Sequence, residues 1–392
     1  MDFIIISTAD WDNPFWTNKQ HTAKALANLG HRVIYIDSLG LRKPTATIID
    51  AKRIINKIKK IKGGIRKVDN NIWVISPISI PFQGIKLIRL LNEFCLISLI
   101  KKYIKLLNFS NPILWTYNPL TSFLIGKIGE SKSVYHCVDE MSAQPGMPKD
   151  TIIELEKNLL KKVDIVYVTS KTLYENKKKY NDKIYYFSNV ADFNHFNKAY
   201  TQKWDKPIDI IDNQRKKIGF IGAITNYKVD FNLLDYIAKT HSDCDFYLIG
   251  KIGEGEPTTT IDEIKENKNI IFLGAKDYKV LPQYLSFFDV CILPCNKNEY
   301  TDSMFPMKFF EYLSAGKPII TTELLSILEF KDYCYVAKNK EEFSKMIDKA
   351  INENSEEKIQ ERFLLAQKYT YESRTKKMLD ILNDLSHKRN FK

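Results

Sequence analysis

Short hydrophobic runs alternate with longer amphipathic stretches along the first half of the chain. Runs that predict buried strands lie at residues 3–7, 32–37, 72–76, 113–116, 134–138, 165–169 and 184–187. Stretches with helical spacing separate them, and the first, at residues 18–29, is followed by Gly30, a residue type favoured directly after a helix. This alternation predicts a parallel sheet covered on both faces.

A second series of the same kind follows a break in the pattern. Residues 192–214 mix polar and aromatic side chains without a strong period. New strand-like runs lie at 217–222, 246–249, 270–273, 290–293, 318–321 and 333–336, and helical patterns follow at 340–352, 355–369 and 371–386. We expect two Rossmann-like α/β domains facing a cleft, at residues 1–195 and 215–370, with a linker at 196–214. The last helix, within 371–392, could cap the second domain or cross back to the first.

The composition is typical of a cytoplasmic globular protein. A chain of 392 residues is long enough for two cores, and its six cysteines are scattered without a cluster of metal ligands. The N-terminus enters a strand without the basic region or cleavage site of a signal peptide. The longest apolar run, 94–100, is well short of the ~20 residues that a membrane-spanning helix needs.

The net charge of +12 is concentrated in one region. Residues 50–105 hold 10 Lys and 3 Arg against 2 Asp and 1 Glu, and they include an apolar, basic helix candidate at 84–107. This mixture is typical of a helix on an anionic membrane surface, although a core helix with a solvated basic edge is the alternative. No nucleic-acid-binding module is recognisable. We expect a peripheral protein on the inner face of the plasma membrane.

The strongest candidate site lies where the second series passes from a strand to a helix. Ligands of open α/β sheets bind beyond the carboxyl ends of the strands. Pro306 is tolerated in a first helical turn, and Gly316 suits a helix end. The N-terminus of this helix would offer backbone N–H groups to an anion, with Lys308 as a cation and Glu311 three residues on. A diphosphate beside Lys308 would bring an attached ribose to Glu311; the alternative is a surface ion pair on a core helix.

The run Pro306-x-Lys308-x-x-Glu311-Tyr312-Leu313-x-Ala315-Gly316-Lys317-Pro318 resembles the donor-site signature of GT-B glycosyltransferases of the retaining group called family 4. The resemblance implies that the helix holds the nucleotide diphosphate and that Glu311 binds the ribose. Gly222 and Lys228 match a glycine that approaches the donor and a lysine that meets phosphate. Gly250 matches a following strand end, and residues 189–196 are similar to the segment between the domains.

Three positions depart from the family pattern. Ser303 stands where the family often has a glutamate that contacts the transferred sugar, and Glu299 or Asp302 could take its place. Ala223 replaces an arginine. The early glycine pair is absent, and residues 9–21 stand in its place and resemble a bacterial subgroup associated with surface polysaccharide synthesis.

This early loop follows the first strand and should therefore face the cleft. Trp11, Phe15 and Trp16, with Asp10, are candidates for binding the acceptor; a packed, turn-rich loop is the alternative. At the end of another strand, Asp139 is expected at the mouth of the cleft.

His136 lies on one side of that strand and is more typical of a core histidine. The candidate catalytic residues are Asp139, His136, Lys228 and Lys308. The candidate donor-binding residues are Gly222, Lys228, Gly250, Ser303, Met307, Lys308 and Glu311.

These residues predict transfer of a sugar from a UDP-, GDP- or dTDP-sugar, with UDP favoured, to a hydroxyl of a saccharide or lipid-linked acceptor. The resemblance places this in capsule, O-antigen or other bacterial surface polysaccharide synthesis and implies retention of configuration. No Asp-x-Asp motif with supporting ligands is found, so we expect catalysis without a metal, with lysines stabilising the leaving diphosphate.

Two alternatives remain. One is an epimerase or phosphorylase of the same architecture, and the other is a nucleotide-sugar-binding subunit without catalysis, which Ser303 motivates. The sequence argues against an NAD-dependent dehydrogenase, because no Gly-x-Gly-x-x-Gly motif follows a strand.

Overall fold

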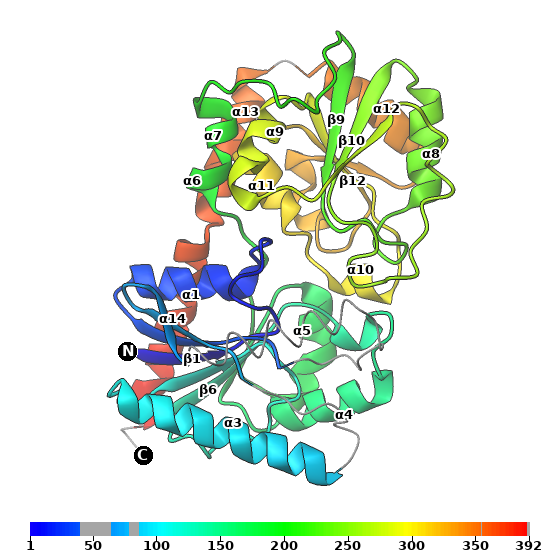
Figure 1. Cartoon of the computed structure of the whole chain (residues 1–392). Coiled ribbons are helices and arrows are strands. Elements are labelled where there is room, and N and C mark those ends of the chain that lie inside the picture. The colour runs from blue at the N-terminus through cyan, green and yellow to red at the C-terminus, as the bar shows by residue number, and fades with distance from the viewer. Residues whose placement is uncertain (40–63, 78–85, 354, 390–392) are drawn as a thin grey trace.

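The computed structural model describes residues 1–39, 64–77, 86–353 and 355–389, and it places two α/β domains one above the other (Figure 1). The sheet of the first domain has the strand order β3-β4-β2-β1-β5-β6-β7-β8. Its strands are β1 Asp2–Ile6, β2 Arg32–Ile36, β3 Arg66–Asp69, β4 Ile72–Ile75, β5 Ile113–Thr116, β6 Lys132–Cys137, β7 Ile165–Val168 and β8 Ile184–Tyr186.

The strands predicted in this domain are confirmed to within two residues at either end, and all of them pair in parallel. The exception to the prediction is β3, an edge strand that pairs antiparallel with β4. Its sequence, Arg-Lys-Val-Asp, carries three charges and no apolar run, so hydrophobicity does not mark it as a strand.

Helices cover both faces of the first sheet, as the alternation of strands and helices predicts. Phe3 and Ile5 point to the face covered by α1 (Asn18–Asn28), where they share a core with Met378. Ile4 and Ile6 point to the other face and share a core with Ile100 of α3 (Lys86–Leu106). The domain also contains α4 (Lys149–Leu160) and α5 (Lys171–Lys177).

The last helix, α14 (Tyr371–Arg389), belongs to the first domain although it follows the second (Figure 1). It packs beside α1, and the hydroxyl of Tyr167 on β7 donates to the backbone carbonyl of Met378 at 2.7 Å. Of the two alternatives for this helix, the structure shows the one in which it crosses back, and the chain passes twice between the domains.

The second sheet is entirely parallel, in the order β11-β10-β9-β12-β13-β14. Its strands are β9 Lys216–Ile221, β10 Cys244–Ile249, β11 Ile270–Gly274, β12 Val290–Leu293, β13 Ile319–Thr322 and β14 Tyr335–Ala337. Its helices are α8 Phe231–Thr240, α9 Leu281–Ser286, α10 Glu299–Ser303, α11 Lys308–Ser314, α12 Lys340–Ile351 and α13 Glu356–Lys368.

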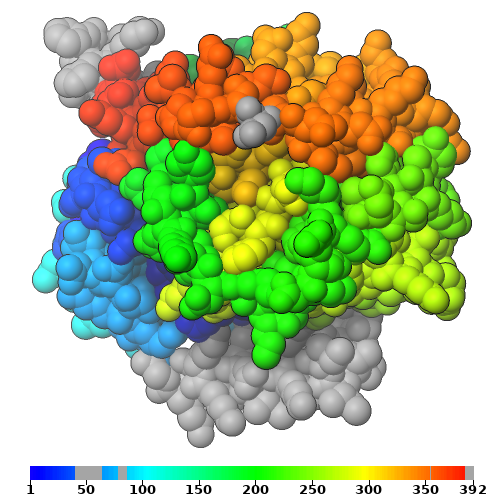
Figure 2. Space-filling view, turned by 90° about the horizontal axis from the view of Figure 1, so that it is seen from above, coloured from blue at the N-terminus to red at the C-terminus, as the bar shows by residue number. Residues whose placement is uncertain are grey.

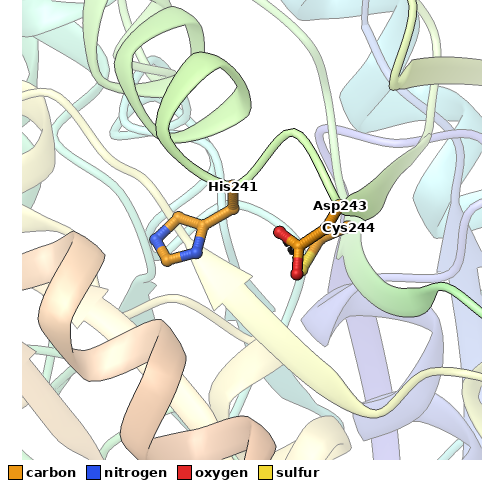
Figure 3. A group of neighbouring side chains, drawn as sticks. All are labelled: His241, Asp243 and Cys244. Atoms are coloured by element: carbon orange, nitrogen blue, oxygen red, sulfur yellow. Dashed lines mark hydrogen bonds between the residues drawn. The ribbon is translucent and has the colours of Figure 1, made fainter.

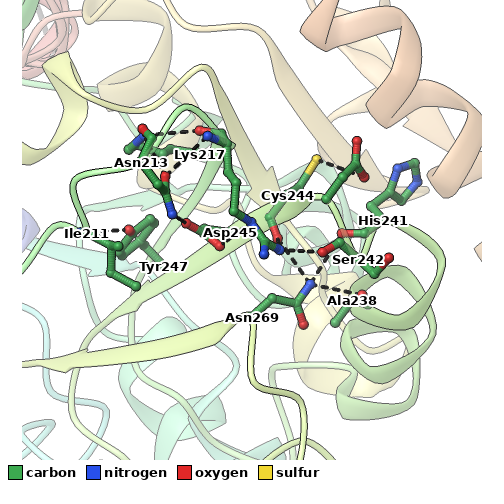
Figure 4. Close-up of polar contacts among 12 residues, drawn as sticks. Ile211, Asn213, Lys217, Ala238, His241, Ser242, Cys244, Asp245, Tyr247 and Asn269 are labelled. Carbon is green, nitrogen blue, oxygen red and sulfur yellow. Dashed lines mark hydrogen bonds and ion pairs between the residues drawn. The ribbon is translucent and has the colours of Figure 1, made fainter.

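The segment between the domains is more ordered than its composition indicates. It forms α6 (Phe193–Phe196) and α7 (Lys198–Thr201) and, seen from above, runs in green across the second domain beside the orange C-terminal helices (Figure 2). The hydroxyl of Tyr200 donates to Glu356 of α13 at 2.9 Å. At its end Arg215 forms an ion pair with Asp245 at 2.8 Å, within a polar network that also includes Asn269 (Figure 4).

The helix expected around Pro306 starts later than predicted. It is α11, which begins at Lys308, and Pro306 precedes it with its carbonyl accepting from the Phe309 N–H at 3.1 Å. Proline has no N–H to offer the first turn, so it suits this position just before the helix. Gly316 follows the helix with a φ of 72°, as a C-terminal glycine should. Among the described residues, no helix is both long and apolar enough to span a bilayer.

Candidate active site

The short helix α10 connects the second domain to the carboxyl ends of strands in the first. The hydroxyl of Tyr300 donates to Asp139, just after β6, at 3.1 Å. Just after β7, the hydroxyl of Ser170 donates to the carbonyl of Ser303 at 2.8 Å. The carboxyl edges of the two sheets therefore face each other at this junction, which is where open α/β sheets bind ligands.

The first turn of α1 makes a second contact between the domains. The side-chain amide of Asn18 donates to the amide oxygen of Asn189 at 2.9 Å, and Asn189 donates to the carbonyl of Phe305 at 2.5 Å. Asn18 also lies 3.9 Å from the sulfur of Met307. The start of α1 and the segment before α11 thus form one packed unit, which includes the predicted donor residue Met307.

Lys308 and Glu311 lie together as the sequence predicts, but not on the surface. The Nζ of Lys308 donates to Glu311 at 2.5 Å, and Glu311 is only 3% exposed. Burial raises the pKa of the Glu311 carboxyl, and the ammonium of Lys308 opposes that shift. The interpretation as a surface ion pair therefore fails, because the carboxylate of the pair is buried.

The loops after β9 and β10 touch backbone to backbone. Gly250 has a φ of 155°, and a Cβ at this residue would lie 1.7 Å from the carbonyl oxygen of Gly222. The requirement for glycine at position 250 is therefore explained by this contact. Lys228, in the loop after β9, lies over the rings of Tyr227 and Tyr300, 5.2 Å from each centroid.

Asp139 is partly exposed and follows β6, and a network of buried ion pairs holds the segment just after this strand. Lys177 donates to Glu140 at 2.9 Å and to Glu156 at 2.7 Å, and all three side chains are buried. Ser142 donates to Glu140 at 2.6 Å. This buried network fixes the segment after β6, so Asp139 faces α10 from a rigid support.

His136 is placed away from this junction. It is fully buried, its Nδ1 lies 3.1 Å from the hydroxyl of Tyr117, and the rings of Trp115 and Tyr167 pack around it. Burial lowers the pKa of His136 well below its ordinary value. The imidazole is therefore neutral near pH 7, and its surroundings favour the core interpretation over a catalytic one.

In the early loop, residues 9–21, some of the candidate acceptor-binding side chains pack inside the protein and others are partly exposed. Trp11 is 8% exposed and packs between Trp16 and Tyr35, with ring centroids 5.1 Å away in both cases. Asp10 accepts the backbone N–H of Ser38 at 3.2 Å. Asp10 and Trp11 thus shape the loop, which favours the packed-loop alternative for them.

Phe15 and Trp16 are half-buried and remain candidates for acceptor contact.

Ser303 stands where the family often has a sugar-contacting glutamate, and Ser303, Glu299 and Asp302 all have contacts with the first domain. Ser303 is 2% exposed, and its carbonyl is held by the first domain. Glu299 forms an exposed ion pair with Lys149 at 2.6 Å. Asp302, whose carbonyl accepts from Thr172 at 2.7 Å, has a partly exposed side chain.

Sequence reasoning missed several polar residues that α1 and α14 bring to the junction. His21 stacks on Tyr371 with centroids 4.2 Å apart, and the guanidinium of buried Arg374 lies 5.1 Å from the same ring. Lys19, in the same turn of α1 as His21, is 8% exposed. Their only signal is a polar first turn of α1. A helical period cannot show that such a turn is buried by residues distant in sequence.

One group of possible metal ligands occurs among the described residues, and it is remote from the junction. His241, Asp243 and Cys244 lie where α8 leads into β10, at the amino end of that strand (Figure 3). Burial raises the pKa of the Cys244 thiol to about 12, and His241 Nε2 lies 2.8 Å from the hydroxyl of Ser344. This group therefore lies at the edge of the second sheet opposite to the junction.

Residues 215–353 match the model of the family "Glycosyl transferases group 1". The match covers most of the second domain. The matched range contains Gly222, Lys228, Lys308 and Glu311, so the resemblance predicted from the donor-site run is confirmed.

Solved structures show that the whole chain has the GT-B fold. Sucrose-phosphate synthase from Thermosynechococcus elongatus aligns with a TM-score of 0.70 and 13% identity, over 98% of this chain and 99% of that one. HepE from Anabaena, in a complex with UDP and glucose, aligns with a TM-score of 0.65 and 14% identity, over 97% and 99%.

A relative with a named biosynthetic role is also similar to part of this chain. The putative teichuronic acid biosynthesis glycosyltransferase TuaH of Bacillus subtilis is 34% identical over 119 residues. The match spans 30% of this chain and 30% of that relative.

We predict that His21 makes the stability of this chain depend on pH. Burial, followed by the charges of Arg374, Lys308 and His195, lowers the pKa of His21 to about 3. The folded state then binds fewer protons than the unfolded state, so the free energy of unfolding falls as the pH drops below about 6.5.

Replacing His21→Phe keeps the ring stacked on Tyr371 and removes the proton. Denaturant titrations between about pH 7 and about pH 5 should then show a loss of stability about 2 kcal/mol smaller than in the wild type. An identical pH dependence in both proteins would contradict the prediction.

Proposed function

We propose that this chain transfers a sugar from a nucleoside-diphosphate sugar to a hydroxyl of a saccharide or lipid-linked acceptor, in bacterial cell-surface polysaccharide synthesis. The observation that carries the proposal is the pairing of Lys308 with buried Glu311, within a group 1 glycosyltransferase domain and beside the first domain. The likeness to a teichuronic acid biosynthesis glycosyltransferase supports the polysaccharide context.

The electrostatics of the site suit a diphosphate donor. When a sugar leaves a diphosphate, negative charge develops on the leaving group, and fixed cations stabilise it. Lys308 and Lys228 supply such charge without a metal ion. A phosphate that attracts Lys308 would release the carboxylate of Glu311 to accept hydroxyls of the ribose. We favour UDP because a structural neighbour contains UDP and glucose.

Asp139 is the acidic residue best placed to contact the sugar or the acceptor. It is partly exposed, it faces α10 through Tyr300, and a buried ionic network supports its segment. We assign retention of configuration to the reaction by resemblance to the family.

A ligand screen tests the donor site. We expect at least one of the UDP-, GDP- and dTDP-sugars to raise the melting temperature of the wild type. Lys308→Gln and Glu311→Gln should each lose most of this increase, because a charge-assisted contact to phosphate or ribose is removed. Lys239→Gln, which removes an exposed lysine paired with Asp235 in the same domain, should retain it.

The products formed when the chain is incubated with a nucleoside-diphosphate sugar distinguish the proposal from its alternatives. Release of the nucleoside diphosphate with a new glycosidic bond supports the proposal, whereas a sugar nucleotide of changed configuration indicates an epimerase. Stabilisation without any turnover indicates a binding subunit. Absence of stabilisation by every donor would remove the donor-site assignment.

We also propose that the first domain rests on the cytoplasmic face of an anionic membrane through α3. One face of this helix is packed in the core through Leu96, Ile100 and Tyr103. The opposite face exposes large apolar side chains at Leu87 (77%), Leu90 (49%), Leu91 (48%) and Phe94 (68%), which recur at helical spacing. A core helix with a merely basic edge would not present such a face.

Exposed basic residues accompany this apolar face along the helix, at Lys86, Arg89, Lys101, Lys102 and Lys105. The rest of the predicted basic region includes residues 50–63 and 78–85, which lie outside the described residues. The free thiols of all six cysteines are typical of a reducing compartment such as the cytoplasm.

Vesicle flotation tests the membrane proposal. The wild type should float with vesicles containing phosphatidylglycerol and not with pure phosphatidylcholine. Replacing Lys101, Lys102 and Lys105 by Gln should sharply reduce flotation, since each basic residue contributes about 1 kcal/mol near an anionic surface. The matched control replaces three exposed lysines of the second domain, Lys338, Lys345 and Lys349. Equal flotation of both triple variants would contradict a role for α3.

A further inference from the structure

Three side chains of the types that bind transition metals meet at the turn between α8 and β10. His241, Asp243 and Cys244 each offer one ligand atom, and these three atoms lie within 4.8 Å of one another. The ring of His241 and the carboxylate of Asp243 face each other across the turn (Figure 3). His241 and Cys244 are buried and Asp243 is exposed, so the group is rooted in the domain and still open to solvent.

The neighbouring helix α12 brings a second carboxylate to the group. An oxygen of Asp348 lies 3.6 Å from Nδ1 of His241, and the side chain is 68% exposed, so it is free to turn toward an ion held on that nitrogen. The Sγ of Cys244 lies 3.9 Å from the carboxylate of Asp243. In a tetrahedral zinc site, bonds of about 2.0–2.3 Å place neighbouring ligand atoms about 3.3–3.6 Å apart. Both measured separations are therefore close to what a bound ion requires.

The same helix orients the imidazole of His241. Its Nε2 lies 2.8 Å from the hydroxyl of Ser344, which can accept a proton from this nitrogen. Nδ1, on the side of Asp348, then presents its lone pair to an ion. Histidines that bind metals usually donate their other ring nitrogen to a polar partner, which fixes both the tautomer and the direction of the ring.

The backbone of the turn is held by polar side chains from two other segments (Figure 4). The amide of Asn269 donates to the carbonyls of His241 and Cys244, at 3.2 and 3.1 Å. The guanidinium of Arg215 donates to the carbonyls of Ser242 and Cys244. The N–H of Cys244 closes the turn on the carbonyl of His241 at 3.0 Å. The ligand atoms are thus supported before any ion binds, as a metal site requires.

We propose that His241, Asp243 and Cys244 bind a divalent cation of the zinc type, with Asp348 as the fourth ligand. Zinc takes thiolate, imidazole and carboxylate ligands together, whereas Mg²⁺ and Ca²⁺ take oxygen ligands. The thiol of Cys244 releases its proton to solvent as the ion binds. The ion connects the turn with α12, and four protein ligands are typical of a structural site. Because the turn lies at the amino end of β10, this site does not rest on the proposed function.

Titration with zinc chloride tests the site in the full chain, after dialysis against a chelator and a reducing agent. We expect calorimetry to show one bound ion per chain, and zinc should raise the melting temperature because it binds the folded state. Asp243→Asn should weaken zinc binding at least about tenfold and lose most of that increase. Asp262→Asn is the matched control, since it changes an exposed aspartate of the same domain that pairs with Lys265, and it should bind zinc as the wild type does.

Cobalt(II) reports on the thiolate directly. A thiolate-to-cobalt charge-transfer band should appear in the wild type and in Cys95→Ser, which removes an exposed thiol, and should be absent in Cys244→Ser. Absence of zinc binding by the wild type, or equal affinity in Asp243→Asn and Asp262→Asn, overturns the site. Unchanged affinity in Asp348→Asn overturns the fourth ligand. If Cys244→Ser does not fold, the aspartate variants decide, because their side chains are exposed.

Discussion

The contact of α1 with the chain between the domains sets the geometry on which the site depends. The amides of Asn18 and Asn189 bond each other, and Asn189 reaches the carbonyl of Phe305 just before the donor helix. Buried amides without partners carry a large penalty, so this chain of hydrogen bonds favours one relative position of its three segments. These hydrogen bonds hold α1, which covers the first sheet, against the segment just before α11.

The charges of the junction are arranged unevenly around that contact. Glu311 has a lysine partner, and Asp139 has the Tyr300 hydroxyl, whereas Lys19 and Lys228 have no ionic partner among the described residues. Lys19 is also buried, and burying a charge without an ion pair costs stability. In the proposed function, Lys308 and Lys228 offset the charge that develops on the leaving diphosphate.

Much of the fold could be predicted because buried parallel strands are continuous apolar runs, and the strand at 290–293 matches β12 residue for residue. The edge strand Arg66–Asp69 has no such run and was missed. In the site, the spacing of Lys308 and Glu311 was sufficient to predict their contact, since both lie on one helix. The burial of Lys19 and His21 was not predictable, because it depends on residues distant in sequence, such as Tyr117 and Tyr371.

The most direct test of the account compares UDP with its 2′,3′-dideoxy analogue in the wild type and in Glu311→Gln. If Glu311 binds the ribose, removal of both hydroxyls should weaken binding to the wild type roughly tenfold or more and should matter far less in the variant. The same loss of affinity in both proteins would contradict the assignment of Glu311, and with it the placement of the donor beside Lys308.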